Sequence, residues 1–374
     1  MFQHRRLNSE KTFFQKIMDL DYILLVSIIL LSVISVFIMY STDGGEILYH
    51  TKNHFTKLVV FFFMMIAISF INIRFWHISA YLLYFAIILL LIWVSFFGIS
   101  VSGSKRWLDL YFIVLQPSEL MKIAIILCLA KYFHRLKVED VNKFQVILIS
   151  LIIIIIPMIL VLSQPDLGTS ILIILSGLVI LWLGGVKIKY FFYSFITFLI
   201  SLPFIISFLK PYQKLRVLTF LDPDRDPLGA GYQIIQSKIA IGSGGLYGKG
   251  FLKGTQSYLD FLPEKHTDFI FTLFSEEFGF IGSILLLIIY SIIIIRIVRI
   301  GVISRSSFAK LFCFGFAFAI FVYITVNLSM VLGLLPIVGS PLPLMSYGGS
   351  SMLATMIGFG IVMSSKIHHD QIIA

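Results

Sequence analysis

Long blocks of apolar residues limit what this chain can fold into. Residues 144–162 read FQVILISLIIIIIPMILVL, and residues 281–295 form a second such block. A run of about 18 or more apolar residues is long enough to cross a bilayer as a helix. The chain is 59% hydrophobic and 13% charged, whereas soluble domains carry about 25% charged residues. The sequence therefore predicts a polytopic membrane protein.

We expect an all-α fold with ten transmembrane helices, which form a single integral membrane domain over residues 1–374. Ten spans place both termini on one side. The short connectors on that side are rich in Lys and Arg, so the positive-inside rule makes it cytoplasmic and leaves the long loop 209–267, between the seventh and eighth spans, outside. The net charge of +10 follows from this bias, and no nucleic-acid partner is expected. The expected spans are residues 21–40, 56–73, 78–98, 117–134, 144–162, 168–185, 190–208, 268–295, 307–333 and 348–365.

Three outer segments are rich in Pro and Gly, which bend the backbone and end helices. They are residues 99–117, the loop 209–267 and residues 334–347, whose sequence LLPIVGSPLPLMSY has three prolines and no charge. Irregular backbone near a membrane persists only where it lines protein or water. Three such segments on one face predict a single cavity that opens outward.

Two stretches of the long loop have local patterns of their own. Residues 232–241 (YQIIQSKIAI) have helical spacing, and this helix would lie in the membrane interface or pack on the roof of the bundle. Residues 240–250 (AIGSGGLYGKG) look like a phosphate-binding loop, but Ser243 stands where that motif needs its first Gly. We expect a flexible turn there and no nucleotide site.

Several ionisable residues stand at membrane depth, where they are costly and often functional. Glu119 and Lys122, in QPSELMK, are three apart and can pair on one helix face, which a purely structural ion pair would also explain. Lys105 and Arg106, in GSKRW, lie on the outer face and suit phosphate oxygens. Asp166, in QPDLGTS, precedes a span and could simply cap it.

The stretch FLPEKHTDFIFTLFSEEFGFIG, residues 261–282, brings the most carboxylates to the membrane boundary. Glu264, His266 and Asp268 share one turn at the expected cavity mouth, and Glu276 and Glu277 follow about two and a half helical turns beyond Asp268. Helix capping alone would account for Asp268. Alternatively, a carboxyl beside an apolar wall has a raised pKa and can serve as a general base.

An outward cavity lined by Arg, Lys and an isolated carboxylate suits an anionic lipid whose hydroxyl must lose a proton. Pyrophosphate is a good leaving group once cations neutralise it, so one base and a few cations would suffice for glycosyl transfer. A transporter of the same lipid would need the same charges. The residues alone leave enzyme and transporter open.

Seven motifs together resemble the SEDS family, which takes its name from shape, elongation, division and sporulation. They occur in the order of that family and span about residues 20–365. The fourth and fifth are more similar to the rod-shape branch than to the division branch. The motifs are KRWLDL, QPSELMK, QPDLGTS, DPLGAGYQIIQSKIAIGSGGLYGKG, TQSYLDFLPEKHTDFIF, EEFGFIG and GLLPIVGSPLPLMSYGGSS.

The resemblance implies a peptidoglycan glycosyltransferase of the bacterial inner (cytoplasmic) membrane, with ten helices and an active site on the outer face. Such an enzyme polymerises lipid II, an undecaprenyl-pyrophosphoryl disaccharide-peptide, onto a lipid-linked nascent glycan during cell-wall elongation and rod-shape maintenance. The implied protein partner is a class B penicillin-binding protein (transpeptidase) of the elongation complex. A lipid II flippase and a recruiting scaffold are the rival functions.

The resemblance also implies roles for single residues. Asp268 is the expected catalytic residue, and no cofactor is expected, although a divalent cation (Mg²⁺ or Mn²⁺) could assist at the pyrophosphate. No metal ligands are assigned, and Glu276 and Glu277 are expected to serve helix packing or partner contact. The expected pyrophosphate ligands are Lys105, Arg106 and Lys122, and Glu119 and Asp166 are expected to support them. Glu264 and His266 are expected to be supporting residues because they share one turn with Asp268, not because of the resemblance.

Overall fold

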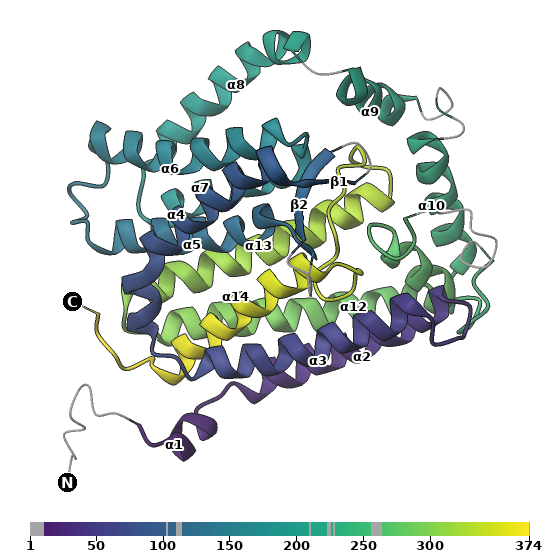
Figure 1. The fold of residues 1–374 in the computed structure, drawn as a ribbon, viewed down its shortest axis with the longest axis horizontal. Coiled ribbons are helices and arrows are strands. Elements are labelled where there is room, and N and C mark those ends of the chain that lie inside the picture. Colours follow the sequence, from purple (N-terminus) through teal and green to yellow (C-terminus); the bar gives the residue numbers. More distant parts are fainter. Residues whose placement is uncertain are drawn as a thin grey trace.

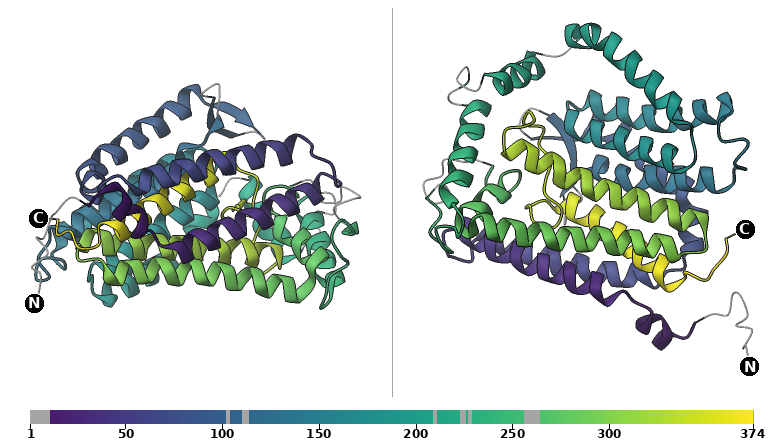
Figure 2. Two further views of the ribbon diagram at one scale, coloured as in Figure 1. Left: turned by 90° about the horizontal axis from the view of Figure 1, so that it is seen from below. Right: turned by 180° about the vertical axis from the view of Figure 1, so that it is seen from behind.

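The protein is a bundle of long helices that run roughly side by side, and 74% of the residues that the structure describes are helical (Figure 1). The computed structural model describes residues 11–101, 104–109, 114–208, 211–222, 226, 229–255 and 264–373. The N- and C-terminal ends lie at the same end of the bundle, and the three strands and α10 lie toward the opposite end (Figure 2). We call this opposite end the strand end.

Each of the ten expected spans overlaps one long helix, in order. Seven of the helices in the described part of the chain (α2, α3, α4, α6, α12, α13 and α14) are long and apolar enough to cross a membrane, so the chain is a multi-pass membrane protein. The helices are α2 (Tyr22–Thr42), α3 (Tyr49–Ser69), α4 (Ile73–Phe97), α5 (Pro117–His134), α6 (Phe144–Ser163), α7 (Leu167–Leu183), α8 (Ile188–Phe208), α12 (Ile270–Ile303), α13 (Ser307–Val331) and α14 (Gly349–Ile367).

Helix α5 lies in the middle of the bundle, against α4, α7, α13 and α14. Pro117 occupies its first turn, where the missing N–H is no loss, and nearly all of its side chains are buried. Helix α8, in contrast, leaves the bundle along most of its length (Figure 1), and its exposed Phe195 and Phe198 are suited to lipid. Both cysteines, Cys128 and Cys313, are free and buried.

The expectation of an all-α fold is wrong in one segment. Three short strands, β1 (Ile99–Val101), β2 (Ser104–Asp109) and β3 (Val114–Leu115), form an antiparallel sheet in the order β1-β2-β3. These strands contain Ile, Val and Trp, which favour strands, and pairing satisfies backbone groups that a bent loop would leave open. The sheet carries Lys105 and Arg106 at the strand end.

The described part of the long loop 209–267 contains two helices, α9 (Pro211–Leu221) and α10 (Ala230–Gly244), and a short α1 (Phe13–Met18) precedes α2. The helix expected over 232–241 lies within α10. Its Ile234, Ser237 and Ala240 are buried, and the Ser237 hydroxyl lies 2.8 Å from Thr272 Oγ1 of α12. This helix therefore packs on the roof of the bundle.

Helix α12 is broken at Gly279, whose φ of 67° and ψ of −163° suit glycine alone. Residues 245–250 lie against the break and pair with its backbone through four hydrogen bonds, so this glycine-rich segment is a fixed joint rather than the expected flexible turn. The bonds are Lys249 N–Glu276 O (3.0 Å), Gly250 N–Glu277 O (3.0 Å), Phe280 N–Gly245 O (2.9 Å) and Ile281 N–Leu246 O (3.1 Å).

Candidate active site

Asp268 lies in the turn 264–269, directly before α12. The N-cap of α12 is Phe269, which has no side-chain cap, so Asp268 does not cap the helix. Its side chain is half-buried and faces the 334–347 loop, where a Cβ on Gly339 would lie 3.4 Å from Asp268 Oδ2. The structure thus removes the capping explanation and leaves this carboxyl facing a neighbouring loop.

The surroundings of Asp268 make its carboxyl hard to ionise. Burial raises its pKa most, the negative charge of Glu264 raises it further, and the pKa reaches about 7. The cations Arg216 and Arg106 act in the opposite direction. A carboxyl with a pKa near 7 beside two cations can accept a proton at neutral pH.

Asp166 is an N-cap and also a member of a polar cluster. Its carboxylate accepts hydrogen bonds from Thr169 N (3.1 Å) and Thr169 Oγ1 (2.9 Å) at the start of α7. It also accepts a 3.0 Å bond from Gln116 Nε2 and lies 3.4 Å from Arg106 Nη1. Asp166 therefore connects the start of α7 to the start of α5 and to strand β2.

Glu119 and Lys122 form a buried pair at the start of α5, with 2.7 Å between Lys122 Nζ and Glu119 Oε1. Tyr323 of α13 donates its hydroxyl to Glu119 Oε2 at 3.4 Å, and Lys122 Nζ lies 4.2 Å from the centre of its ring. Lys122 is close enough to Asp166 for their charges to interact. These residues and the Asp166 cluster therefore form one charged group.

Lys105 and Arg106 do not act as a pair in this structure. Successive side chains of a strand point to opposite faces, and Arg106 is the one that reaches Asp166. The Lys105 side chain is exposed, and among the described residues no hydrogen bond or ion pair joins it to the Asp166 cluster. Of the two cations expected to bind pyrophosphate in this segment, the structure brings only Arg106 to the site.

Glu264 and His266 take different positions in the turn 264–269. Glu264 is exposed and accepts a 2.9 Å hydrogen bond from Thr267 Oγ1, while its charge acts on Asp268. The His266 ring contacts the end of α2, where His266 Nδ1 lies 3.0 Å from Thr42 Oγ1, and stacks on His50 at the start of α3. Glu264 therefore affects Asp268 electrostatically, whereas His266 anchors the turn to the adjoining ends of α2 and α3.

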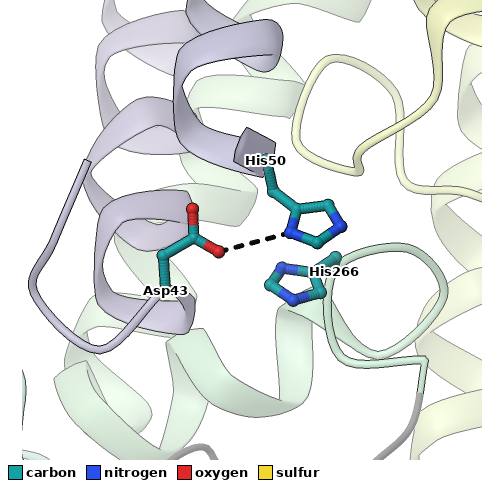
Figure 3. A group of neighbouring side chains, drawn as sticks. All are labelled: Asp43, His50 and His266. Carbon is teal, nitrogen blue, oxygen red and sulfur yellow. Dashed lines mark ion pairs between the residues drawn. The ribbon is translucent and has the colours of Figure 1, made fainter. Parts of the chain in front are cut away.

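Asp43, His50 and His266 have metal-ligating atoms within 4.8 Å of one another (Figure 3). Asp43 lies 3.4 Å from His50 Nδ1 and accepts hydrogen bonds from Thr51 N (2.9 Å) and Oγ1 (2.6 Å). The two imidazole rings are stacked, 4.1 Å apart and 15° from parallel. Ring lone pairs lie in the ring plane, so stacked rings do not direct them at one ion. The hydrogen bonds from Thr51 and the stacking of the two rings account for the arrangement of Asp43, His50 and His266.

Glu276 and Glu277 are buried and hold the segment 249–255 against α12. Glu276 Oε1 lies 2.7 Å from Lys249 Nζ and accepts hydrogen bonds from Thr255 N (2.9 Å) and Thr255 Oγ1 (2.8 Å). Glu277 accepts a short hydrogen bond from Ser41 of α2. The expected packing role agrees with these contacts, which lie within the chain.

Sequence reasoning missed three residues of the site, two that act on Asp268 and one that contacts Asp166. Arg216 of α9, whose charge acts on Asp268, also donates to Ile337 O at 3.2 Å. Gln116 donates to Asp166, and Asn327 of α13 donates to the Asp268 carbonyl. A cation in the outer loop was a visible signal for Arg216, but several other Lys and Arg residues there obscured it. Gln116 opens the motif QPSELMK, but neither amide carries a charge that would single it out in an apolar chain.

The family model FtsW/RodA/SpoVE, described as "Cell cycle protein", matches residues 16–371. This chain belongs to that family. The resemblance expected from the motifs is confirmed, since FtsW and RodA are the division and rod-shape members.

Curated relatives cover nearly the whole chain. "Peptidoglycan glycosyltransferase MrdB" of Escherichia coli (strain K12) is 42% identical over 367 residues, which are 97% of this chain and 98% of that protein. "Probable peptidoglycan glycosyltransferase FtsW" of Buchnera aphidicola subsp. Schizaphis graminum is 39% identical over 332 residues, 85% of this chain and 92% of that protein.

Two solved structures have the same fold. A chain described under "Structural coordination of polymerization and crosslinking by a peptidoglycan synthase complex" is 30% identical, with a TM-score of 0.80 and coverage of 93% of this chain and 97% of that one. The Thermus thermophilus rod shape determining protein RodA is 25% identical, with a TM-score of 0.68 and coverage of 94% and 97%.

Proposed function

We propose that this protein is a peptidoglycan glycosyltransferase that polymerises lipid II into glycan strands during cell-wall elongation and rod-shape maintenance. The observation that carries the proposal is Asp268, a half-buried carboxyl with a pKa near 7 that lies within range of Arg106 and Arg216. The names of the MrdB and FtsW relatives support the same activity. An acid–base group beside cations suits transfer from a pyrophosphate-linked sugar.

In the proposed reaction, Asp268 accepts the proton of the C4 hydroxyl on the acceptor lipid II sugar. The resulting oxygen attacks the anomeric carbon of the lipid-linked growing strand, and the bond from that carbon to the pyrophosphate oxygen breaks. Arg106 and Lys122 stabilise the departing lipid pyrophosphate, with Lys105 as an outer contact and Glu119 and Asp166 orienting the cations. General-base help of this kind is worth about 10² to 10⁴ in rate.

The proposed setting is the bacterial inner membrane, crossed by ten helices, with cytoplasmic termini and the strand end outside. Both chain ends lie at the end of the bundle away from the strands, and the clustered charges lie at the start of α5 and α7, which supports this orientation (Figures 1 and 2). The proposed protein partner is a class B penicillin-binding protein of the elongation complex, in line with the synthase complex to which this fold is similar.

A divalent cation, Mg²⁺ or Mn²⁺, remains part of the proposal only as an aid to pyrophosphate departure. The two acidic residues of the charged group already have partners, because Asp166 contacts Thr169, Gln116 and Arg106, and Glu119 contacts Lys122. They do not form a ready set of oxygen ligands. In the proposed reaction, the charged side chains of this protein therefore stabilise the departing pyrophosphate.

The test uses the purified protein in vesicles with fluorescent lipid II, with and without the class B partner. A ladder of glycan products on a gel is the expected result. Movement of lipid II across the bilayer without polymer would replace the proposal with a flippase. If the protein shows neither polymerisation nor lipid II movement in the presence of the partner, the result would favour a scaffold.

A further inference from the structure

Three consecutive carbonyl groups of the turn 264–269 each accept a hydrogen bond from another part of the bundle. Two donors come from the end of the 334–347 loop, and the third comes from inside α13. All three donors are distant from the turn in sequence, so these tertiary contacts add to the local bonds from Thr267 N and Phe269 N to Glu264 O in fixing its shape. The bonds are Tyr347 N–His266 O (2.8 Å), Ser346 Oγ–Thr267 O (2.6 Å) and Asn327 Nδ2–Asp268 O (2.9 Å).

Asn327 has the most demanding position of these donors. It is fully buried in α13, a helix long and apolar enough to cross the membrane. Its Nδ2 donates to the carbonyl of Asp268 at 2.9 Å and to the carbonyl of Ser340 at 2.7 Å. Polar side chains inside such helices are costly and are retained for a reason. The side-chain amide of Asn327 therefore binds two backbone carbonyls, one in each of two segments.

The two carbonyls held by Asn327 belong to the two segments that meet at the Asp268 carboxyl, the turn 264–269 and the 334–347 loop. One is the carbonyl of Asp268 itself, and the other belongs to Ser340, the neighbour of Gly339, which faces Asp268 Oδ2. One amide group therefore sets the separation between the carboxyl and the loop that it faces. Ser346 adds a second link, since it donates to Thr267 O and accepts from Leu342 N at 2.7 Å.

We propose that Asn327 is a positioning residue for Asp268, with Ser346 in a secondary positioning role. The inference rests on the proposed function. Asn327 does not contact substrate; it keeps the Asp268 carboxyl at the distance and angle needed to reach the acceptor hydroxyl. A misplacement of about 1 Å can cost about 10² in rate, so a loss of the Asn327 donors should lower kcat more than it changes substrate binding.

The test compares wild type with Asn327→Leu, which has similar size and no donor. Ser340→Ala is the matched control, because the buried Ser340 hydroxyl has no partner among the described residues and its carbonyl is unchanged. We expect Asn327→Leu to lower kcat by about 10 to 100-fold, with KM for lipid II within about twofold of wild type. Ser340→Ala should keep both constants.

Two further results keep the inference open to refutation. Thermal unfolding in detergent gives the folded fraction, and kcat is calculated per folded molecule. If Asn327→Leu fails to fold, Ser346→Ala is measured instead, with an expected kcat loss of about 3 to 10-fold at unchanged KM. If wild type is active and Asn327→Leu is equally active, the inference is refuted and the proposed function stands. The same holds for Ser346→Ala where it is measured instead. An inactive wild type would refute the proposed function and the inference with it.

Discussion

Replacing Glu276 with Gln tests whether the joint at Gly279 is held by a buried charge. Glu276 is fully buried, and its Oε1 meets Lys249 Nζ at 2.7 Å and two donors of Thr255. Hydrogen bonds to a charged group contribute about 1.5–3 kcal/mol, against about 0.5–1.5 kcal/mol for neutral pairs. Replacing the charged Glu276 with neutral Gln therefore loses about 1 kcal/mol per contact, or about 3 kcal/mol over the three contacts. Lys249 is 28% exposed and can turn to water, which lowers the expected cost to about 2 kcal/mol.

The assay is thermal unfolding of purified protein in detergent. An unfolding entropy of about 2.1 cal/mol/K per residue over 374 residues gives a midpoint shift of about 1.3 °C per kcal/mol, so Glu276→Gln should lower the midpoint by about 2.5 °C. The control is Asp140→Asn, which breaks an ion pair of the same 2.7 Å length between exposed side chains and should leave the midpoint unchanged. The double variant Lys249→Met/Glu276→Gln should lose less than the sum of the two single variants. Equal midpoints for Glu276→Gln and Asp140→Asn would refute the reasoning.

Three other predictions concern the site. Because the pKa of Asp268 is raised to about 7, its base form prevails above that pH, and initial polymerisation rates should rise with pH through about 7; a flat profile would argue against this base. Gly168→Ala would place a Cβ 2.4 Å from Val338 O, so it should displace the 334–347 loop and lower the polymerisation rate. Gly242→Ala, where a Cβ would meet open space, should keep the rate. Equal rates for the two variants would contradict the prediction. Arg106→Gln should raise KM for lipid II more than Lys105→Gln does, because Arg106 is the cation at Asp166; the reverse order would remove Arg106 from the site.

The helices could be predicted because membrane thickness sets both their length and their apolar character. Helix α5 was predicted despite Glu119 and Lys122, whose spacing of three indicated the pair that the structure contains. The strands around Arg106 were not predicted, because strands of two to six residues have no signal comparable to an apolar run of 18.

The candidate site was partly visible in the sequence. Charges such as Asp268 and Asp166 stand out in an apolar chain, so their positions could be found without coordinates. The break at Gly279 could not, because its hydrogen-bond partners are residues 245–250, which precede it by about thirty positions. Asn327 was also missed, since its partners are backbone carbonyls in two distant segments, and backbone carries no sequence signal.

The most direct test of the account compares the polymerisation rate of wild type with that of Asp268→Asn, each reconstituted with the class B partner and supplied with lipid II. Asn keeps the shape of the side chain but cannot accept the proton. We predict a rate loss of about 10² to 10⁴ for Asp268→Asn. Its unfolding midpoint above pH 7 should equal or exceed that of wild type, because an ionised carboxyl with a raised pKa destabilises the fold there. Equal polymerisation by the two proteins would contradict the assignment of Asp268 as the base.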